Sequence, residues 1–252
     1  MQKNFIVTLY FLCCVHVLQA QDYTELMKQA ALQEQQMKEP EALNTYKQAL
    51  MVKPNDIPAL LKCSQLHLII GYKEKEEKII YQQYNEAKTY TDKALQADSN
   101  NAEINYNMAV VCSRLAKIET EKKKIATYIK NTKVYAEKAI QLKPNFAKAW
   151  NILGCWHYDI INLPGFKKTA IKLLYGGLSG ATLEQSIQCY EKCLALDPFY
   201  LPNYIDLAKA YRDDNQLNKE TIMLQKAVKL PVHNSLEIAL KIEAKKKLEE
   251  LQ

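Results

Sequence analysis

Stretches of mixed polar and apolar residues with helical spacing make up most of the chain after residue 21. They are separated by short segments that carry Pro, Asn or Asp, residues that end helices and form turns. The 252 residues include only 6 Gly and 8 Pro, which leaves little turn chemistry for strands, and no strand is predicted. The pattern predicts helix pairs over residues 22–51, 57–97, 102–142, 147–196 and 201–230, with a last helix over 235–251.

The second helix of each predicted pair ends in a similar segment, which begins with a small residue and in most cases leads to Pro. The five segments are Ala49–Asn55, Ala94–Asn100, Ala139–Asn145, Cys193–Phe199 and Ala227–Pro231. Their first residues lie 45, 45, 54 and 34 positions apart. A period of 34 is that of the tetratricopeptide repeat, which is a hairpin of two helices.

The two spacings of 45 exceed that period by 11 residues, which is about three turns of an α-helix. A helix that is lengthened by whole turns keeps its apolar face aimed at the same neighbours. We therefore expect the second helices over Lys73–Ala97 and Glu119–Leu142 to be longer by three turns. Gly71 is expected to form the bend at which the first of them begins.

Small residues stand where the two helices of a hairpin are expected to cross. The repeat motif Trp-x2-Leu-Gly-x2-Tyr is matched best by Trp150–His157 and Tyr204–Tyr211, which place Gly154 and Ala208 at the crossing. The sequence thus predicts an all-α, tetratricopeptide-like solenoid of about five hairpins with lengthened second helices and a C-terminal capping helix. One repeat domain over 21–252 is expected, with units at about 22–55, 56–100, 101–145, 146–199 and 200–232 and the cap at 235–251.

The N-terminal segment has the features of a secretory signal peptide. An apolar run over residues 5–17 follows Lys3 and precedes the small residue Ala20. The run is short for a membrane span, which takes roughly 20 residues. We expect a signal peptide over residues 1–20 and an exported mature chain, periplasmic or secreted, without a transmembrane span. The alternative is a chain that stays anchored in a membrane through residues 5–20.

Cysteine spacing and charge favour neither a metal site nor nucleic-acid binding. The spacings match no zinc site and no disulfide framework, and we expect five small buried packing residues, Cys63, Cys112, Cys155, Cys189 and Cys193. The formal net charge is +6, with the excess of Lys in residues 114–148. These lysines are spread around long helices without interleaved aromatic residues, which favours a solvated surface.

Residues 162–182 interrupt the fourth hairpin. Phe166–Tyr175 has helical periodicity, and a Gly-rich segment over 176–180 follows it. Thr182 and Gln185 have the spacing of a capping box that restarts the second helix. The insertion is interpreted as a flexible loop or, alternatively, as a lid over a binding surface.

Several blocks in this region resemble, in order, the C-terminal part of the regulator of microtubule dynamics family. The blocks are Leu153–Tyr158, Leu163–Pro164, Lys167–Lys172, Gly176–Leu178 and Thr182–Ile187, preceded by Lys124–Lys130 and Glu137–Pro144, and the family-motif positions in them are Gly154, Trp156, His157, Pro164, Gly176 and Gly177. The resemblance runs from about Glu121 to the C-terminus. It implies an all-helical repeat fold and interaction functions, with microtubule association in eukaryotic members. An exported chain would be a bacterial relative that meets no tubulin.

The sequence has no catalytic motif. It contains no Ser-His-Asp or Cys-His order, no His-Glu-x-x-His and no dinucleotide-binding fingerprint, so we expect no enzyme activity and no cofactor. His157 and Asp159 stand two positions apart, and such residues point to different sides of a helix. The alternative hypothesis is a small-ligand-binding or enzymatic pocket around Trp156 and His157, beneath the 162–182 loop.

The leading hypothesis is a scaffold that binds a protein or peptide partner. In tetratricopeptide stacks the first helices of the hairpins line a concave groove. The positions expected to face it are Tyr106, Val110, Arg114, Lys148, Asn151, Cys155, Tyr158, Asp159, Ile205, Lys209 and Arg212. Their mixture of basic and aromatic groups is suited to an extended peptide or its carboxylate. The alternative is that these positions form ordinary solvated faces.

Overall fold

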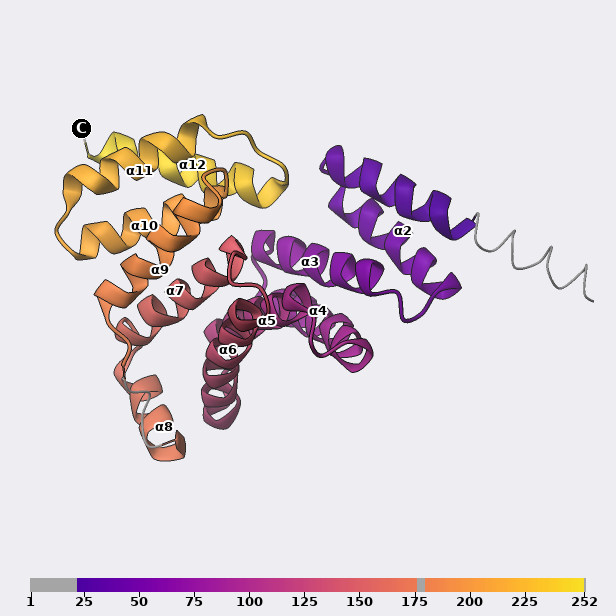
Figure 1. The fold of residues 1–252 in the computed structure, drawn as a ribbon, viewed down its shortest axis with the longest axis horizontal. Helices are drawn as coiled ribbons and strands as arrows, with labels where there is room; N and C mark the ends of the chain where they lie inside the picture. The colour runs from indigo at the N-terminus through magenta and orange to yellow at the C-terminus, as the bar shows by residue number, and fades with distance from the viewer. Residues whose placement is uncertain (1–21, 176–179, 252) are drawn as a thin grey trace, which may run out of the picture.

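A computed structural model describes residues 22–175 and 180–251, and the regular structure within these ranges is entirely helical. Residues 22–35 form a helix that pairs with α2 (Glu39–Val52). The next pairs are α3 (Ile57–Lys73) with α4 (Glu77–Ala97), α5 (Ala102–Ile118) with α6 (Lys122–Leu142), α7 (Ala147–Ile161) with α9 (Leu183–Leu196) and α10 (Leu201–Asp213) with α11 (Leu217–Lys229). Helix α8 (Gly165–Tyr175) is inserted between α7 and α9, and α12 (Ser235–Glu250) ends the stack (Figure 1). The predicted all-α solenoid of hairpins is confirmed.

The hairpins α3–α4 and α5–α6 are longer than the others, and both helices of each hairpin share the extra length. Helices α4 and α6 have 21 residues each against 14 in α9, which is about two turns more. Helices α3 and α5 have 17 residues each against 13 in α10, which is about one turn more. The prediction that all three turns lie in the second helix is therefore wrong. Added length in one helix alone would leave its apolar face without a partner.

Gly71 lies inside α3, so the prediction that it forms a bend is also wrong. A Cβ atom placed on Gly71 would lie 2.7 Å from Cε1 of Tyr84 on α4. Gly154 in α7 has the same role, since a Cβ atom there would lie 2.7 Å from Cε1 of Tyr190 on α9. At both places the absence of a side chain lets a buried tyrosine ring lie directly against the backbone of the first helix.

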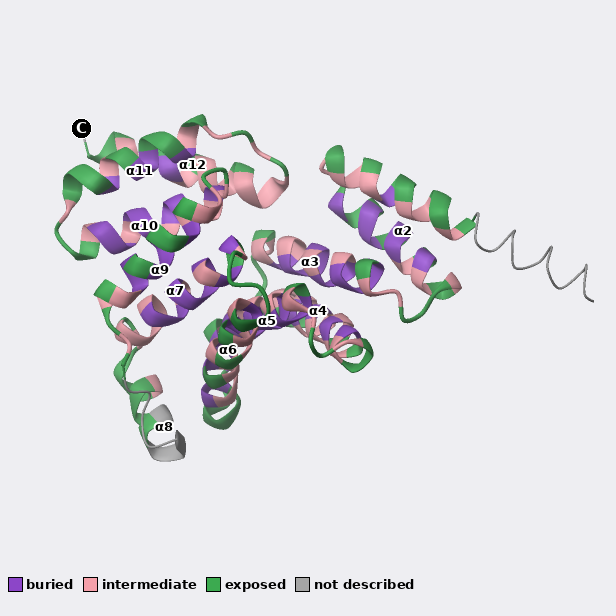
Figure 2. Ribbon diagram, in the orientation of Figure 1, coloured by how far each residue is buried: buried purple, intermediate pink, exposed green. Residues whose placement is uncertain are grey.

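The small residue that opens each repeat-end segment is a core position. The five such residues, Ala49, Ala94, Ala139, Cys193 and Ala227, are each 0% exposed. Figure 2 shows that buried residues gather on the faces where neighbouring helices meet. None of the helices within the described ranges is both long and apolar enough to cross a membrane.

The stack curves until its last helix meets its N-terminal half. The backbone N–H of Ser235, at the start of α12, donates to Oε1 of Glu39 at 3.0 Å. Lys73 Nζ lies 3.8 Å from Oε2 of the same carboxylate, which is almost fully buried. Helix α12 also contacts α3, and Figure 1 shows these two segments facing each other across the open side of the arc. The described helices therefore form a nearly closed ring, with the first helices of the hairpins on its inner side.

The close approach at Gly154 yields a test of the hairpin crossing. We predict that Gly154→Val lowers the free energy of unfolding by about 2 kcal/mol or more, because the new side chain overlaps the buried Tyr190 ring. Gly165→Val is the matched control, since a Cβ atom there has no neighbour within 4 Å among the described residues, and we expect a change within about 0.5 kcal/mol. Urea unfolding measures both variants, and an equal loss in both would contradict the packing role.

The ring closure yields a test with a pH dependence. Burial by itself raises the pKa of the Glu39 carboxyl, but hydrogen bonds from Ser235 and the charge of Lys73 outweigh burial and leave this pKa lowered. A carboxyl with a lowered pKa stabilises the fold above its unfolded pKa, about 4.3 for Glu, and that contribution is lost as the pH falls below this value.

We therefore predict that Glu39→Ala lowers the free energy of unfolding by about 1.5 kcal/mol at neutral pH. The difference from the unsubstituted chain should shrink as the pH falls below about 4. Glu41→Ala, an exposed position on the same helix, should change stability little at any pH. Urea titrations at several pH values measure the free energy of unfolding of both variants. A loss of stability in Glu39→Ala that does not depend on pH would show that the carboxylate charge has no part in closing the ring.

Candidate partner-binding groove

The inner side of the ring holds a cavity of about 330 Å³, which we call the inner cavity. Its wall comes from α3, α5, α7 and α10, which are first helices of their hairpins, and from the start of α12. The second helices pack behind the first ones, so that the inner faces of the first helices remain open to the cavity. The concave surface is thus enclosed on its C-terminal side by the last helix.

Seven of the eleven positions predicted for the groove line the inner cavity. They are Tyr106, Val110, Arg114, Lys148, Asn151, Cys155 and Lys209. Two others are used in packing between neighbouring helices. The Tyr158 hydroxyl donates to Oδ2 of Asp213 at 2.7 Å, and Ile205 is 1% exposed in the core.

The last two predicted positions also lie outside the inner cavity. Arg212 Nε donates at 2.6 Å to Oε1 of Glu220, whose side chain is buried. Asp159 lines a second cavity and forms an ion pair with Lys117 at 3.1 Å. The structure therefore brings together the predicted positions on α5, those on α7 up to Cys155, and Lys209 of α10. It places the other four, Tyr158, Asp159, Ile205 and Arg212, outside the inner cavity.

The charges that face the inner cavity are predominantly positive. Four cations line it, Arg114, Lys117, Lys148 and Lys209, against the two carboxylates of Asp206 and Glu237. Lys117 and Lys209 are paired with Asp159 and with Glu243, at 3.1 and 3.4 Å. In the described part of the chain, Arg114 and Lys148 have no carboxylate within 4.0 Å.

Each of these two cations lies over a tyrosine ring. The Arg114 guanidinium is 5.3 Å from the ring centroid of Tyr72, and Lys148 Nζ is 5.5 Å from that of Tyr200. Both tyrosines also line the inner cavity. Contact with a ring face holds a cation in place but does not neutralise it. The wall therefore offers two positioned positive charges without a carboxylate partner.

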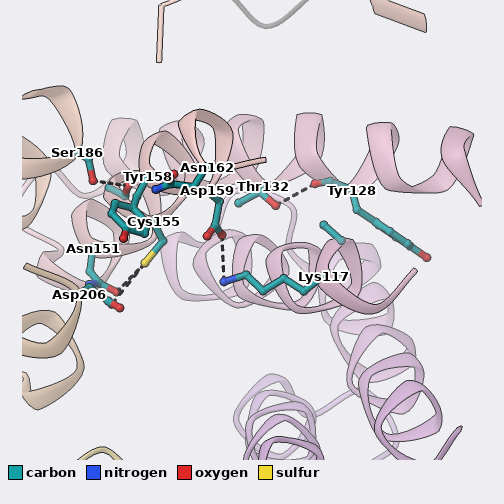
Figure 3. A network of polar contacts seen from close by, with 12 residues as sticks. Lys117, Tyr128, Thr132, Asn151, Cys155, Tyr158, Asp159, Asn162, Ser186 and Asp206 are labelled. Carbon is teal, nitrogen blue, oxygen red and sulfur yellow. Dashed lines mark hydrogen bonds and ion pairs between the residues drawn. The ribbon is translucent and has the colours of Figure 1, made fainter. Parts of the chain in front are cut away.

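A polar network connects α7 with α10 at the edge of the inner cavity (Figure 3). Asp206 accepts hydrogen bonds from Asn151 Nδ2 at 3.1 Å and from Cys155 Sγ at 3.4 Å. Burial and the neighbouring charge of Asp206 hold the pKa of the Cys155 thiol well above its usual range. Cys155 therefore stays a neutral thiol at neutral pH and is not an activated nucleophile. The other four cysteines after residue 20 are buried, as predicted, whereas Cys155 is partly exposed.

A second cavity, of about 300 Å³, lies beside the start of α8, and we call it the α8 cavity. Its apolar wall consists of Ala116, Ile129, Trp156, Ile160, Leu163 and Pro164, and its polar wall of Ser113, Lys117, Thr132, Asp159, Asn162 and Lys167. Two lysines hold α8 in place: Lys167 Nζ donates to Ala116 O at 3.0 Å, and Lys168 Nζ donates to Ile161 O at 2.9 Å. The inserted segment is thus a helix tied to the C-terminal ends of α5 and α7.

The predicted capping box after this insertion is confirmed, since Gln185 N donates to Thr182 Oγ1 at 3.1 Å. Trp156 lines the α8 cavity, and its Nε1 donates to Ile129 O at 2.9 Å. Pro164 lines it as well, whereas Gly176 and Gly177 lie outside the described residues.

His157 does not line the α8 cavity. It is 7% exposed and lies edge-on to the Trp156 ring, with ring centroids 5.0 Å apart. Its Nδ1 has no hydrogen-bond partner among the described residues, and burial lowers the pKa of the imidazole, so the ring is neutral at neutral pH. Asp159 forms its ion pair with Lys117 instead, and the spacing of two positions predicted that it would not face His157. No catalytic pair is formed between these two residues. Within residues 22–175 and 180–251, no cluster of three or more His, Cys, Asp or Glu is placed to hold a metal ion.

The sequence-based prediction of the groove did not include Tyr72, Lys117, Tyr200 and Asp206, which also line the inner cavity. Helical spacing contained a signal for two of them, because Lys117 follows Arg114 by three positions and Asp206 precedes Lys209 by three, so that each pair shares a helix face. For the part of the wall formed by α12, including Leu236 and Leu240, the sequence held no signal, because it depends on the closure of the ring.

The chain is similar to proteins of one known family. The family described as regulator of microtubule dynamics protein 1-3 matches residues 26–252. Regulator of microtubule dynamics protein 1 of Mus musculus is 28% identical over 173 residues, which cover 68% of this chain and 55% of that protein. Regulator of microtubule dynamics protein 3 of Xenopus laevis is 34% identical over 131 residues, 51% of this chain and 28% of that protein. The chain thus spans about half or less of the length of these relatives.

Two solved structures share the fold. A thermophilic TPR protein of Thermus thermophilus superposes with a TM-score of 0.65 at 14% identity, over 90% of this chain and 99% of that one. PilF of Pseudomonas aeruginosa gives a TM-score of 0.54 at 14% identity, over 92% of this chain and 86% of that one. These likenesses establish a tetratricopeptide fold and nothing about a ligand.

Proposed function

The chain belongs to the regulator of microtubule dynamics family, and on that premise we propose that it is a non-catalytic scaffold whose inner cavity binds an acidic segment of a protein partner. The tetratricopeptide fold supports a protein or peptide as the ligand, because stacked hairpins present an extended concave surface. The names of the relatives refer to microtubule dynamics, but the chain spans only part of them, and the proposal does not depend on that role.

The observation that carries the proposal is the pair of cations without carboxylate partners, Arg114 and Lys148. Both line the inner cavity from the neighbouring helices α5 and α7 and lie over tyrosine rings, with Arg114 half-buried and Lys148 exposed. Carboxylates of an extended peptide complement such charges, and a guanidinium binds a carboxylate in bidentate fashion. Tyr72, Tyr106 and Tyr200 add rigid aromatic contact area in the same wall.

Nucleic acid and catalysis fit the cavity less well. A phosphate backbone needs a continuous basic stripe, whereas the inner cavity also contains Asp206 and Glu237. The Cys155 thiol is neutral, and His157 is buried away from both cavities, so the wall holds no prepared nucleophile or base. A shaped and charged surface without activated groups supports recognition over reaction.

Charge reversal in the cavity tests the proposal. We predict that Arg114→Glu combined with Lys148→Glu weakens binding of a poly-Glu peptide by tenfold or more, because two attractive charge pairs become repulsive. The matched control is Lys192→Glu, an exposed position on the outer helix α9, which should leave the affinity unchanged at moderate salt. Fluorescence anisotropy of a labelled peptide measures both variants, and equal weakening in both would assign binding to overall charge and reject the cavity.

We further propose that the protein acts outside the cytoplasm, in the periplasm or as a secreted protein. The apolar run over residues 5–17 after Lys3 supports export, and this segment lies outside the described residues. We predict that N-terminal sequencing of the protein from its native cells gives a start at Gln21. A chain that keeps residues 5–20 would favour the anchored alternative, and recovery of the intact chain from the cytosol would overturn export.

A further inference from the structure

The inner cavity and the α8 cavity adjoin. Ser113 and Lys117 of α5 line both of them, so the two hollows share one stretch of wall. The ion pair between Lys117 and Asp159 lies at this junction and is half-exposed, and Figure 3 shows the Lys117 side chain reaching from α5 towards α7. An extended segment in the inner cavity can therefore turn a side chain towards the α8 cavity at Lys117.

The size and lining of the α8 cavity suit an apolar group. Its volume of about 300 Å³ is roughly twice that of a 150 Å³ apolar protein cavity that holds benzene. The indole of Trp156 and the side chains of Ile129, Ile160 and Leu163 form the floor. Trp156 Nε1 is already satisfied by Ile129 O, so the indole offers the cavity only its apolar surface. Filling such a space with a large side chain removes apolar surface from water on both partners.

The charges at the mouth of the α8 cavity suit an occupant with acidic neighbours. Lys117, Lys167 and Asp159 line the wall, which leaves one positive charge in excess. Burial lowers the pKa of the Lys167 ammonium, the charge of Asp159 opposes this shift, and Lys117 adds to it. A nearby carboxylate would therefore be stabilised by this cation, whose hydrogen-bond partners among the described residues are the backbone carbonyl oxygens of Ala116 and Lys117.

We propose that the α8 cavity is an anchor subsite that takes one large apolar side chain, aromatic or long aliphatic, from the acidic segment bound in the adjoining inner cavity. This inference rests on the proposed function, because it assigns both cavities to one peptide. The turn after α7 and the start of α8, held by Lys167 and Lys168, cover the subsite. The inner cavity supplies the preference for acidic segments, and the α8 cavity selects among them by one apolar residue.

Two synthetic peptides test the subsite. Both alternate Asp and Glu, and they differ only in a central Phe or Ala. Trp150→Phe leaves Trp156 as the single tryptophan, so its emission reports on the α8 cavity. We expect the Phe peptide to bind about tenfold or more tightly than the Ala peptide, as burial of a benzyl group implies, and to shift the Trp156 emission.

Three variants assign the preference to the cavity. Ala116→Leu places a branched side chain in the wall. The ratio of the affinities for the Phe and Ala peptides should fall to about one, with the affinity for the Ala peptide unchanged. Lys167→Ala releases the cover from the end of α5 and should also reduce the preference. Lys172→Ala is the matched control, because this lysine is exposed on α8 and does not line the cavity, and it should keep the preference. If Ala116→Leu fails to fold, the comparison of Lys167→Ala with Lys172→Ala still tests the subsite.

The outcomes separate the two proposals. If both peptides bind equally, or if Ala116→Leu and Lys167→Ala keep the preference for Phe, the subsite is overturned while binding of acidic segments stands. If neither peptide binds, the proposed function falls and the subsite falls with it. A third probe, decanoate, tests a lipid-like occupant. An emission shift of Trp156 with decanoate and none with the Phe peptide would also overturn the peptide assignment.

Discussion

The close approach of the two helices in each hairpin is the constraint on which the rest of the structure depends. Gly154 admits a tyrosine ring against its backbone, and Gly71 does so in the second hairpin. At Ser64 the crossing is polar: Asn107 Nδ2 donates to the hydroxyls of Ser64 and Thr91, at 2.7 and 2.8 Å, and ties α3, α4 and α5 together. These buried groups are satisfied by one another, so the polar crossing specifies its geometry without an unpaired donor. Larger side chains at such positions would separate the helices and change the curvature of the stack.

That curvature creates the enclosed surface. Because the arc nearly closes, Glu39 near the N-terminal end of the described chain accepts a hydrogen bond from Ser235, 196 positions away. The contact lets α12 complete the wall of the inner cavity, which in an open stack would be a shallow groove. Enclosure also excludes part of the water around the half-buried Arg114, and interactions between charges are stronger where less water screens them. The geometry of the hairpin crossings therefore affects how strongly Arg114 attracts a partner.

Local signals in the sequence predicted the helices, the small core positions and the Thr182–Gln185 capping box, since each depends on residues only a few positions apart. The spacing of 45 residues gave the number of added turns. It could not show how these turns are shared between the two helices of a hairpin, because a turn fits equally well into either helix. Mapping a uniform repeat onto the chain placed Arg212 in the groove, yet the buried Glu220 on the next helix binds it. The contribution of α12 depends on contacts across nearly the whole chain, which no local pattern records.

The two departures from the regular repeat explain each other. The lengthened α5–α6 hairpin extends an apolar tip that includes Ile125 and Ile129, and a neighbouring hairpin of ordinary length, α7–α9, does not reach all of it. The inserted segment after α7 covers that tip: Leu163 packs beside it, and α8 lies against α6. Lys167 then binds carbonyl oxygens in the last turn of α5. Helix α5 is about one turn longer than α10, and this is the additional turn. The cover is incomplete, and the space that it leaves is the α8 cavity. The cavity is thus a product of both departures, and a uniform repeat would contain neither the overhang nor its cover.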